Sequence, residues 1–187
     1  MAKKIKREII EWVIFFLIVG GLYFTGYHTE VIGTLQRGVL MTGLFQPTKN
    51  ETKIKADYTL VLEDVNGNTV DLSQWKGQPI FLNLWATWCP PCIAEMPDIN
   101  QLYLEVNPSI KFAIISVDED REKAIAFAKR KQFDFPIYFP KNELPKVYRS
   151  GAIPTTHVIN SNGEIVVTQK GMAKYSSDIF IAFLRSL

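Results

Sequence analysis

The sequence predicts an α/β domain, with a mixed central sheet and helices on both of its faces, preceded by one transmembrane helix. Three observations support this prediction: an apolar run close to the N-terminus, an alternation of apolar strands with amphipathic helices from residue 80 onward, and two turn sequences typical of hairpins, Asn66-Gly67-Asn68 and Ser161-Asn162-Gly163. The length of 187 residues fits one such domain with an appendage.

Residues 1–8 form a basic stretch, and residues 9–27 form an apolar run whose single charge is Glu11. Nineteen helical residues extend over roughly 28 Å, which is close to the thickness of the hydrocarbon layer of a bilayer. Four Lys or Arg residues precede the run, whereas only Arg37 occurs in the twenty residues after it. The positive-inside rule therefore predicts a cytoplasmic N-terminal tail, a single-pass anchor at 9–27 in the cell (inner) membrane, and an extracytoplasmic, periplasmic remainder.

Two alternatives to a permanent anchor remain open on the sequence. The uncharged core from Trp12 to Phe24 is thirteen residues long, which is also typical of the apolar part of a cleaved signal peptide. However, the nearest small residues that could form a cleavage site, Val19 and Gly21, lie inside the apolar run. A buried core helix is the second alternative, and the terminal position and basic flank of the run argue against it.

The segment 28–56 gives weak signals. Val31, Leu35 and Val39 recur at helical spacing, but three glycines in the same stretch lower its helix propensity. An amphipathic element at the membrane surface is one interpretation. We favour the other, a juxtamembrane linker of irregular structure between the anchor and the domain.

Residues 57–187 are expected to form the domain. The strand at 80–85 is apolar at nearly every position, as expected for a strand buried on both faces. The helix that follows has an apolar stripe, and Pro97 is expected to kink this helix without ending it. The expected strands are 58–62, 69–72, 80–85, 111–117, 135–139, 155–159 and 164–168, and the expected helices are 91–106, 119–131, 143–148 and 176–187.

The composition excludes several classes of function. The net charge of +2 gives no basic excess of the kind that nucleic-acid binding requires. The two cysteines, Cys89 and Cys92, are too few for a disulfide-rich scaffold or a four-thiolate zinc site. A mixed zinc site would need His28 and His157, which lie on distant and dissimilar segments. We therefore expect no metal, no cofactor and no nucleic-acid partner.

The Cys89-x-x-Cys92 pair falls where the strand 80–85 turns into a helix. A helix N-terminus presents free N–H groups and the positive end of the helix dipole, so the pKa of Cys89 is expected to fall below the ordinary value of about 8.5. Cys92 lies one turn further along and is expected to be less exposed. We therefore expect a redox-active disulfide in which Cys89 attacks, Cys92 resolves the mixed disulfide, and Trp88 offers a partner an apolar surface. A structural disulfide is the alternative, although closing so small a loop adds little stability.

The segment from Leu84 to Pro97, LWATWCPPCIAEMP, resembles the active-site segment of thioredoxin-fold proteins. Within that fold it is most similar to the membrane-anchored, extracytoplasmic branch called TlpA/ResA-like. The resemblance covers roughly residues 56–187 and includes the N-terminal hairpin, the active-site helix, a central helical insertion and the segment 151–155. It implies a thioredoxin-like fold for the domain.

The resemblance also implies roles for individual residues. Pro154 matches the proline that is cis in thioredoxins, and the backbone of Ile153 would then bind an extended substrate by strand addition. Asn83 occupies the position of a buried Asp of thioredoxins, so that proton route is absent. Glu95 matches a Glu of this branch, and a partly buried carboxylate with a raised pKa would take the proton of Cys92. The alternative for Glu95 is a solvated carboxylate on the helix surface.

Three other side chains are expected to be structural. His157 lies on a predicted strand and is expected to pack, partly buried, rather than to act in catalysis. Trp75 and Trp85 are expected to belong to the core, which leaves Trp88 as the tryptophan placed to contact a partner.

These observations predict a membrane-tethered thiol-disulfide oxidoreductase whose substrates are disulfides of partner proteins. In the family, the usual direction is reduction of a protein such as apocytochrome c awaiting haem or a metallochaperone. Because such reduction needs electrons from across the membrane, the resemblance implies a thiol-relay membrane protein as electron donor. An oxidant that introduces or isomerises disulfides and a non-catalytic binding module are the alternatives. Peroxidase chemistry is disfavoured because Ala86 replaces the Thr of the Thr-x-x-Cys arrangement of peroxiredoxins.

Overall fold

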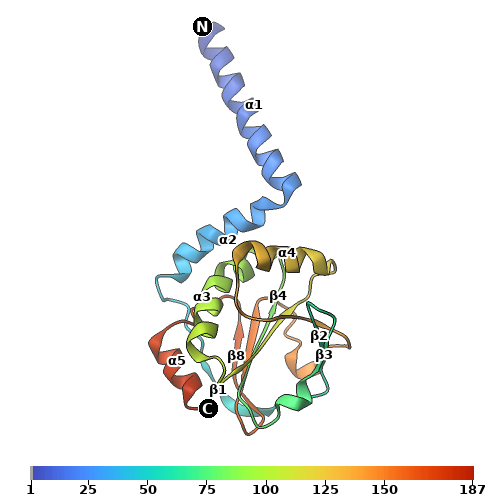
Figure 1. Cartoon of the computed structure of the whole chain (residues 1–187). Helices are drawn as coiled ribbons and strands as arrows, with labels where there is room; N and C mark the ends of the chain where they lie inside the picture. Colours follow the sequence, from blue (N-terminus) through green and yellow to red (C-terminus); the bar gives the residue numbers. More distant parts are fainter. Residues whose placement is uncertain (1) are drawn as a thin grey trace.

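A mixed sheet forms the centre of the protein, of which the computed structural model describes residues 2–187 (Figure 1). Its strands are β1 (Lys49–Lys55), β2 (Val61–Asp64), β3 (Thr69–Asp71), β4 (Ile80–Trp85), β5 (Lys111–Ser116), β6 (Ile137–Pro140), β7 (Thr155–Ile159) and β8 (Glu164–Lys170). They lie in the order β1-β8-β7-β4-β5-β6-β2-β3. The neighbours β4, β5 and β6 are parallel, whereas the other neighbouring pairs are antiparallel.

The helices of the described residues are α1 (Ala2–Thr25), α2 (Tyr27–Leu40), α3 (Pro90–Val106), α4 (Arg121–Lys131) and α5 (Asp178–Arg185). Two short 3-10 helices span Leu72–Trp75 and Lys146–Tyr148. Side chains just before two of the helices accept backbone N–H groups of the first turn, Asp120 for α4 and Ser177 for α5. Such caps fix where these helices begin.

Two apolar cores lie on the two faces of the sheet. Strand β4 is buried at all six positions, and its side chains alternate between the cores. Phe81 and Trp85 face the core to which α3, α4 and α5 contribute, whereas Leu82 and Leu84 face the other core. That second core is covered by the two 3-10 helices and neighbouring loops rather than by long helices.

The predicted strands and hairpins agree with the structure to within a few residues. β4 has the predicted bounds, and both expected hairpins form, β2 with β3 and β7 with β8. The helix expected at 143–148 is shorter and is a 3-10 turn at Lys146–Tyr148. Pro97 lies inside α3, which continues through it.

Residues 28–56 are not irregular in structure, so the interpretation of this segment as an irregular connector is wrong. This segment contains α2 and β1, and β1 pairs with β8 at the edge of the sheet. The weak signal has a physical reason: β1 is polar, and the face of α2 that packs on the domain is formed by Gly33 and Leu40 rather than by the apolar stripe.

Helix α2 is fixed against the domain beside the start of α3. A side chain at Gly33 would bring its Cβ to 2.9 Å from the backbone oxygen of Pro90, so the two helices touch through this glycine. Glu30 of α2 pairs with two residues of α4, with Arg130 and, at 2.7 Å, with the Nζ of Lys131.

Helix α1 projects away from the domain (Figure 1). Its residues Arg7–Thr25 form one helix that is long and apolar enough to cross a membrane, judged by length and composition, and none of it is buried within the protein. This agrees with a single-pass membrane protein, with α2 following the span directly.

Candidate active site

The two cysteines form a disulfide at the point where β4 leads into α3. Cys89 is the residue before the first turn of α3, and Pro90 begins the helix, where a proline loses no hydrogen bond. Cys89 is 5% exposed and Cys92 is 0% exposed. The disulfide therefore reaches the surface at Cys89 alone, as the sequence predicts for the attacking and resolving thiols.

The start of α3 provides electrostatic stabilisation for a thiolate at Cys89. The backbone N–H of Cys92 donates to the Sγ of Cys89 at 3.3 Å, and the Sγ lies at the positive end of the helix dipole. In the reduced protein these interactions favour the thiolate over the thiol. The position of the pair thus suits Cys89 to nucleophilic attack.

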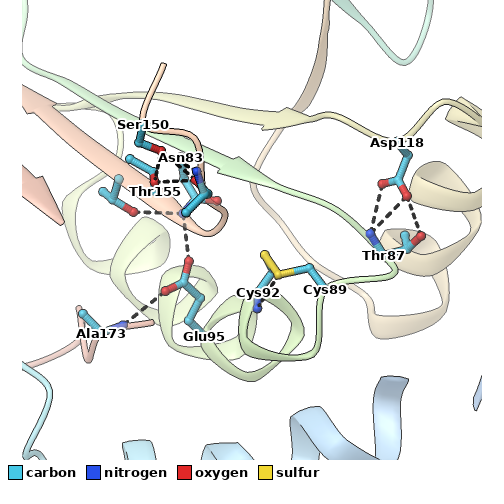
Figure 2. The surroundings of a disulfide bond; sticks show 11 residues. Asn83, Thr87, Cys89, Cys92, Glu95, Asp118, Ser150, Thr155 and Ala173 are labelled. Carbon is cyan, nitrogen blue, oxygen red and sulfur yellow. Dashed lines mark hydrogen bonds between the residues drawn. A yellow bond between two sulfur atoms is a disulfide. The ribbon is translucent and has the colours of Figure 1, made fainter. Parts of the chain in front are cut away.

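The loop that leads to Cys89 is held by Asp118, which follows β5. Its carboxylate accepts the backbone N–H of Thr87 at 3.0 and 3.1 Å and the Thr87 hydroxyl at 2.6 Å (Figure 2). The hydroxyl of Ser116 donates to the same carboxylate at 2.8 Å. Asp118 is not among the site residues that the sequence predicts. Its place two residues after β5 is a usable signal, because the carboxyl ends of the parallel neighbours β4 and β5 meet at one edge of the sheet.

Glu95 is fully buried, so the alternative of a solvated surface carboxylate is wrong. Its Oε1 accepts the side-chain N–H of Asn83 at 2.8 Å, and its Oε2 accepts the backbone N–H of Ala173 at 3.2 Å (Figure 2). Burial raises its pKa to about 8; the two hydrogen bonds oppose this shift, and the charge of Asp98 adds to it. A carboxyl group that titrates near neutral pH thus lies one helical turn after Cys92.

Asn83 belongs to a buried polar chain on the face of the sheet that α3 covers. Its side-chain nitrogen also donates to the Oγ1 of Thr156 at 2.9 Å, and that oxygen accepts the hydroxyl of Tyr175 at 2.8 Å. All of these side chains are buried, and burial raises the pKa of Tyr175 well above its ordinary value. Asn83, at the position where thioredoxins have a buried Asp, therefore orients the carboxyl group of Glu95 in this protein.

Pro154 lies at the same edge of the sheet as the disulfide. Leu84, near the end of β4, pairs with Thr155 at the start of β7, so the loops that leave these two points are neighbours. The bond between Ile153 and Pro154 is cis, which confirms that prediction. Pro154 is buried and Ile153 is half-buried, next to a turn fixed by hydrogen bonds among Ser150, Ala152 and Thr155.

Trp88 is 59% exposed, beside the disulfide. It lines a groove of about 860 Å³ between the active-site loop and the junction of α1 with α2, and the groove is also lined by Tyr27, His28 and Asp118. Trp85 is fully buried, and Trp75 is partly buried against the second core. Among the three tryptophans of the domain, Trp88 is thus the exposed one, and it is the one for which the sequence predicts contact with a partner.

His157 is a packing residue, as predicted. It is 2% exposed, its Nδ1 lies 3.3 Å from the Oγ1 of Thr168, and its ring packs against that of Tyr148. Burial lowers its pKa to about 4, so it is neutral at physiological pH.

Comparisons with known proteins assign the chain to a family. Residues 49–179 match the Redoxin family. Thiol-disulfide oxidoreductase ResA of Halalkalibacterium halodurans is 34% identical over 128 residues, which span 67% of this chain and 73% of that protein. ResA of Geobacillus kaustophilus is 36% identical over 107 residues, which span 56% of this chain and 62% of the relative, less than two thirds of its length.

The solved structures agree with this assignment. The crystal structure of StoA from Bacillus subtilis has a TM-score of 0.54 and 29% sequence identity, and covers 64% of this chain and 92% of StoA. The predicted thioredoxin-like fold is therefore confirmed, as is the resemblance that the segment from Leu84 to Pro97 indicates. The chain belongs to the Redoxin family and, within it, to the ResA-like thiol-disulfide oxidoreductases.

Proposed function

We propose that the protein is a membrane-anchored, extracytoplasmic thiol-disulfide oxidoreductase that reduces disulfides of partner proteins through Cys89 and Cys92. The observation on which this rests is the disulfide at the start of α3, which reaches the surface only at the 5% exposed Cys89 and is followed one turn after Cys92 by the buried carboxyl of Glu95. The basic residues at the N-terminal end of α1 support a cytoplasmic N-terminus and an extracytoplasmic domain.

The reaction begins with the reduced protein. The Cys89 thiolate attacks one sulfur of the partner's disulfide; that S–S bond breaks, a mixed disulfide forms, and the departing partner thiolate takes a proton from water. Glu95, as carboxylate, accepts the proton of Cys92, whose thiolate then attacks the Sγ of Cys89. The second partner thiolate leaves and takes a proton from water, and Glu95 releases to water the proton that it took from Cys92. Two electrons have then passed to the partner, and the Cys89–Cys92 disulfide remains.

The substrate is proposed to bind beside the disulfide. The half-buried Ile153 next to Pro154 would offer its backbone to an extended segment of the partner, and Trp88 would cover the apolar side chains of that segment. Apocytochrome c and metallochaperones are the partner classes that we propose, because both require free thiols outside the cytoplasm.

Regeneration of the dithiol needs an electron donor, since the chain has no third cysteine. We assign this role to a membrane protein with its own thiol pair, which would reduce the Cys89–Cys92 disulfide by the reverse exchange. The packing of α2 on the start of α3 supports this choice, because it keeps the disulfide close to the end of the span at Thr25.

Substitution of each cysteine by serine tests the assignment of the two thiols. We expect Cys89→Ser to abolish reduction of a model protein disulfide, whereas Cys92→Ser keeps the first step and accumulates a mixed disulfide with the partner. Full activity of Cys89→Ser would contradict the assignment. Mass spectrometry of the species trapped by Cys92→Ser identifies the partner.

A redox titration of the wild-type protein against glutathione distinguishes the direction of electron flow. A reduction potential near that of thioredoxin, about −270 mV, supports a reductant, whereas a value near −120 mV would identify an oxidant instead. Full replacement of the wild type in cells by a variant in which both cysteines are Ala would identify a binding module.

A further inference from the structure

Helix α2 has two faces of different environment. One face packs on the domain, where Gly33 and Leu40 are buried. The opposite face is apolar and exposed: Val31 is 46%, Leu35 is 71% and Val39 is 47% exposed. These three residues recur every four positions, so they form one ridge along the helix. Ile32 extends the ridge on one side and is 43% exposed.

An apolar ridge of this kind is unusual on a domain that is surrounded by water. Single exposed apolar side chains are ordinary, but contiguous ones mark a contact surface. The apolar exposure also continues past the end of α2, where Met41 is 69% and Leu44 is 78% exposed. The domain itself does not cover this surface, because it already occupies the other face of α2.

The position of α2 along the chain indicates what covers the ridge. The candidate span ends at Thr25, and α2 begins at Tyr27, so Gly26 alone separates them. Gly26 has φ of 77°, a left-handed conformation that permits the abrupt turn between the helices. In Figure 1, α2 runs along the top of the domain, across the direction in which α1 leaves it. When α1 spans the bilayer, the first turn of α2 therefore lies at the bilayer surface.

We propose that α2 lies in the lipid–water interface, with the ridge of Val31, Leu35 and Val39 embedded in the bilayer surface and the Gly33 face bound to the domain. The chemistry agrees with an interfacial helix, which buries one apolar face among lipids and keeps its other face out of them. Tyr27, half-exposed at the start of α2, is of a type favoured at this depth. This inference rests on the proposed anchoring by α1 and goes beyond the redox activity.

The proposal fixes the orientation of the active site. The start of α3 touches α2 at Gly33, so the disulfide lies about one helix diameter, ~10 Å, from the interface. The groove beside Trp88 has the end of α1 and the start of α2 as one wall, so it opens at the level of the bilayer surface. Partners whose cysteines lie close to the membrane would thus reach the disulfide most directly.

A spin label on α2 in the full chain tests this placement. In the oxidised protein Cys89 and Cys92 are joined, so a cysteine introduced by Leu35→Cys is the single free thiol for labelling. The labelled protein is reconstituted in phosphatidylcholine vesicles, and collision rates with oxygen and with a water-soluble nickel complex are measured by electron paramagnetic resonance. We expect an oxygen-to-nickel ratio several-fold higher than for Arg37→Cys, an exposed position on another side of the same helix.

Both positions are exposed in the protein, so labelling them should leave the fold intact. A nickel accessibility at Leu35 equal to that at Arg37 would place the ridge in water and overturn the proposal. Low accessibility to both reagents at Leu35 would indicate a protein partner, such as a second copy, and would also overturn it.

A third label, introduced by Phe16→Cys in α1, separates this proposal from the anchoring on which it depends. A lipid-exposed Phe16 together with a water-exposed Leu35 would refute the interfacial position of α2 alone. A water-exposed Phe16 would refute the anchor, and the interfacial position with it. Neither result would change the redox assignment of Cys89 and Cys92, which the serine variants test.

Discussion

Glu95 has a carboxyl group whose titration should govern the pH dependence of thiol exchange. Its burial raises the pKa to about 8, and only the ionised form can take the proton of Cys92. The hydrogen bonds from Asn83 and Ala173 favour that ionised form and keep the pKa from rising further. Glu95 is therefore both ionisable near neutral pH and fixed in position.

Replacing Glu95 by Gln should remove the proton acceptor while keeping the shape of the side chain. We expect kcat/KM for a model disulfide to rise with pH through about 8 in the wild type, and the Gln variant to lose both that rise and roughly a hundredfold in rate at the upper end. The measurement is kcat/KM as a function of pH. Glu143→Gln, at an exposed residue, is the control and should behave as wild type.

Asn83→Leu should raise the pKa of Glu95 further, because the carboxylate loses its side-chain donor. A hydrogen bond to a charged group contributes about 1.5–3 kcal/mol, which corresponds to about one to two pKa units. The midpoint of the kcat/KM profile should shift to higher pH by that amount. Thr156→Val keeps the bond between Asn83 and Glu95 and serves as the control. An unshifted midpoint in Asn83→Leu would show that Asn83 does not tune Glu95.

At the scale of elements, the contact of α2 with α3 depends on the absence of a side chain at Gly33. A Cβ there would lie 2.9 Å from the Pro90 backbone oxygen and 3.0 Å from the Cγ2 of Ile93, and a backbone oxygen cannot move aside without moving the start of α3. This contact joins the segment that follows the membrane span to the helix that bears the disulfide.

Gly33→Val should therefore separate the two helices. We expect a loss of about 1–3 kcal/mol in the free energy of unfolding, measured by urea denaturation of the oxidised chain in detergent micelles. Gly38→Ala is the matched control: a Cβ there meets no atom within 4 Å, so the higher helix propensity of Ala should stabilise the protein slightly. Equal stability of Gly33→Val and wild type would contradict the close packing.

The elements differ in how far the sequence alone predicts them. β4 and the two hairpins follow from apolar runs and Asn-Gly turns, so their positions are predicted to within a few residues. α2 and β1 could not be predicted in this way, since α2 packs through Gly33 and β1 is polar. Asp118 lies between these cases: its place after β5 is visible in the sequence, but its contact with Thr87 exists only once β4 and β5 are neighbours.

At the scale of the whole molecule, two buried titratable groups lie on opposite faces of the sheet, and they change the stability of the fold in opposite directions as the pH rises. Glu95 belongs to the helix that covers one face, and burial raises its pKa to about 8. His157 on β7 packs against Tyr148 of the second core, and burial lowers its pKa to about 4. Each group prefers to be neutral in the folded chain, so each destabilises the fold at the pH where it must become charged.

The pH dependence of stability follows from these two shifts. The pKa of His157 is 6.5 in the unfolded chain and about 4 in the fold. Its contribution to the free energy of unfolding is therefore full above pH 6.5 and is lost as the pH falls towards about 4. The pKa of Glu95 is 4.5 in the unfolded chain and about 8 in the fold. Its contribution to the free energy of unfolding is therefore full below pH 4.5 and is lost as the pH rises through about 8. Between pH 4.5 and 6.5 the two groups change the free energy of unfolding with equal and opposite slopes, so we expect a plateau, with this free energy constant over that range.

Above the plateau only Glu95 acts, so the free energy of unfolding should fall by about 2 kcal/mol between pH 6.5 and 8. The measurement is urea denaturation with the disulfide closed, so that no thiol titrates in this range. In Glu95→Gln the fall should disappear, and stability should instead rise by about 2–3 kcal/mol from pH 4.5 to 6.5, because His157 then acts alone. A Glu95→Gln profile parallel to that of the wild type would mean that Glu95 is ionised in the fold at neutral pH, and that the carboxylate is then available to Cys92 without the pH rise in activity predicted above.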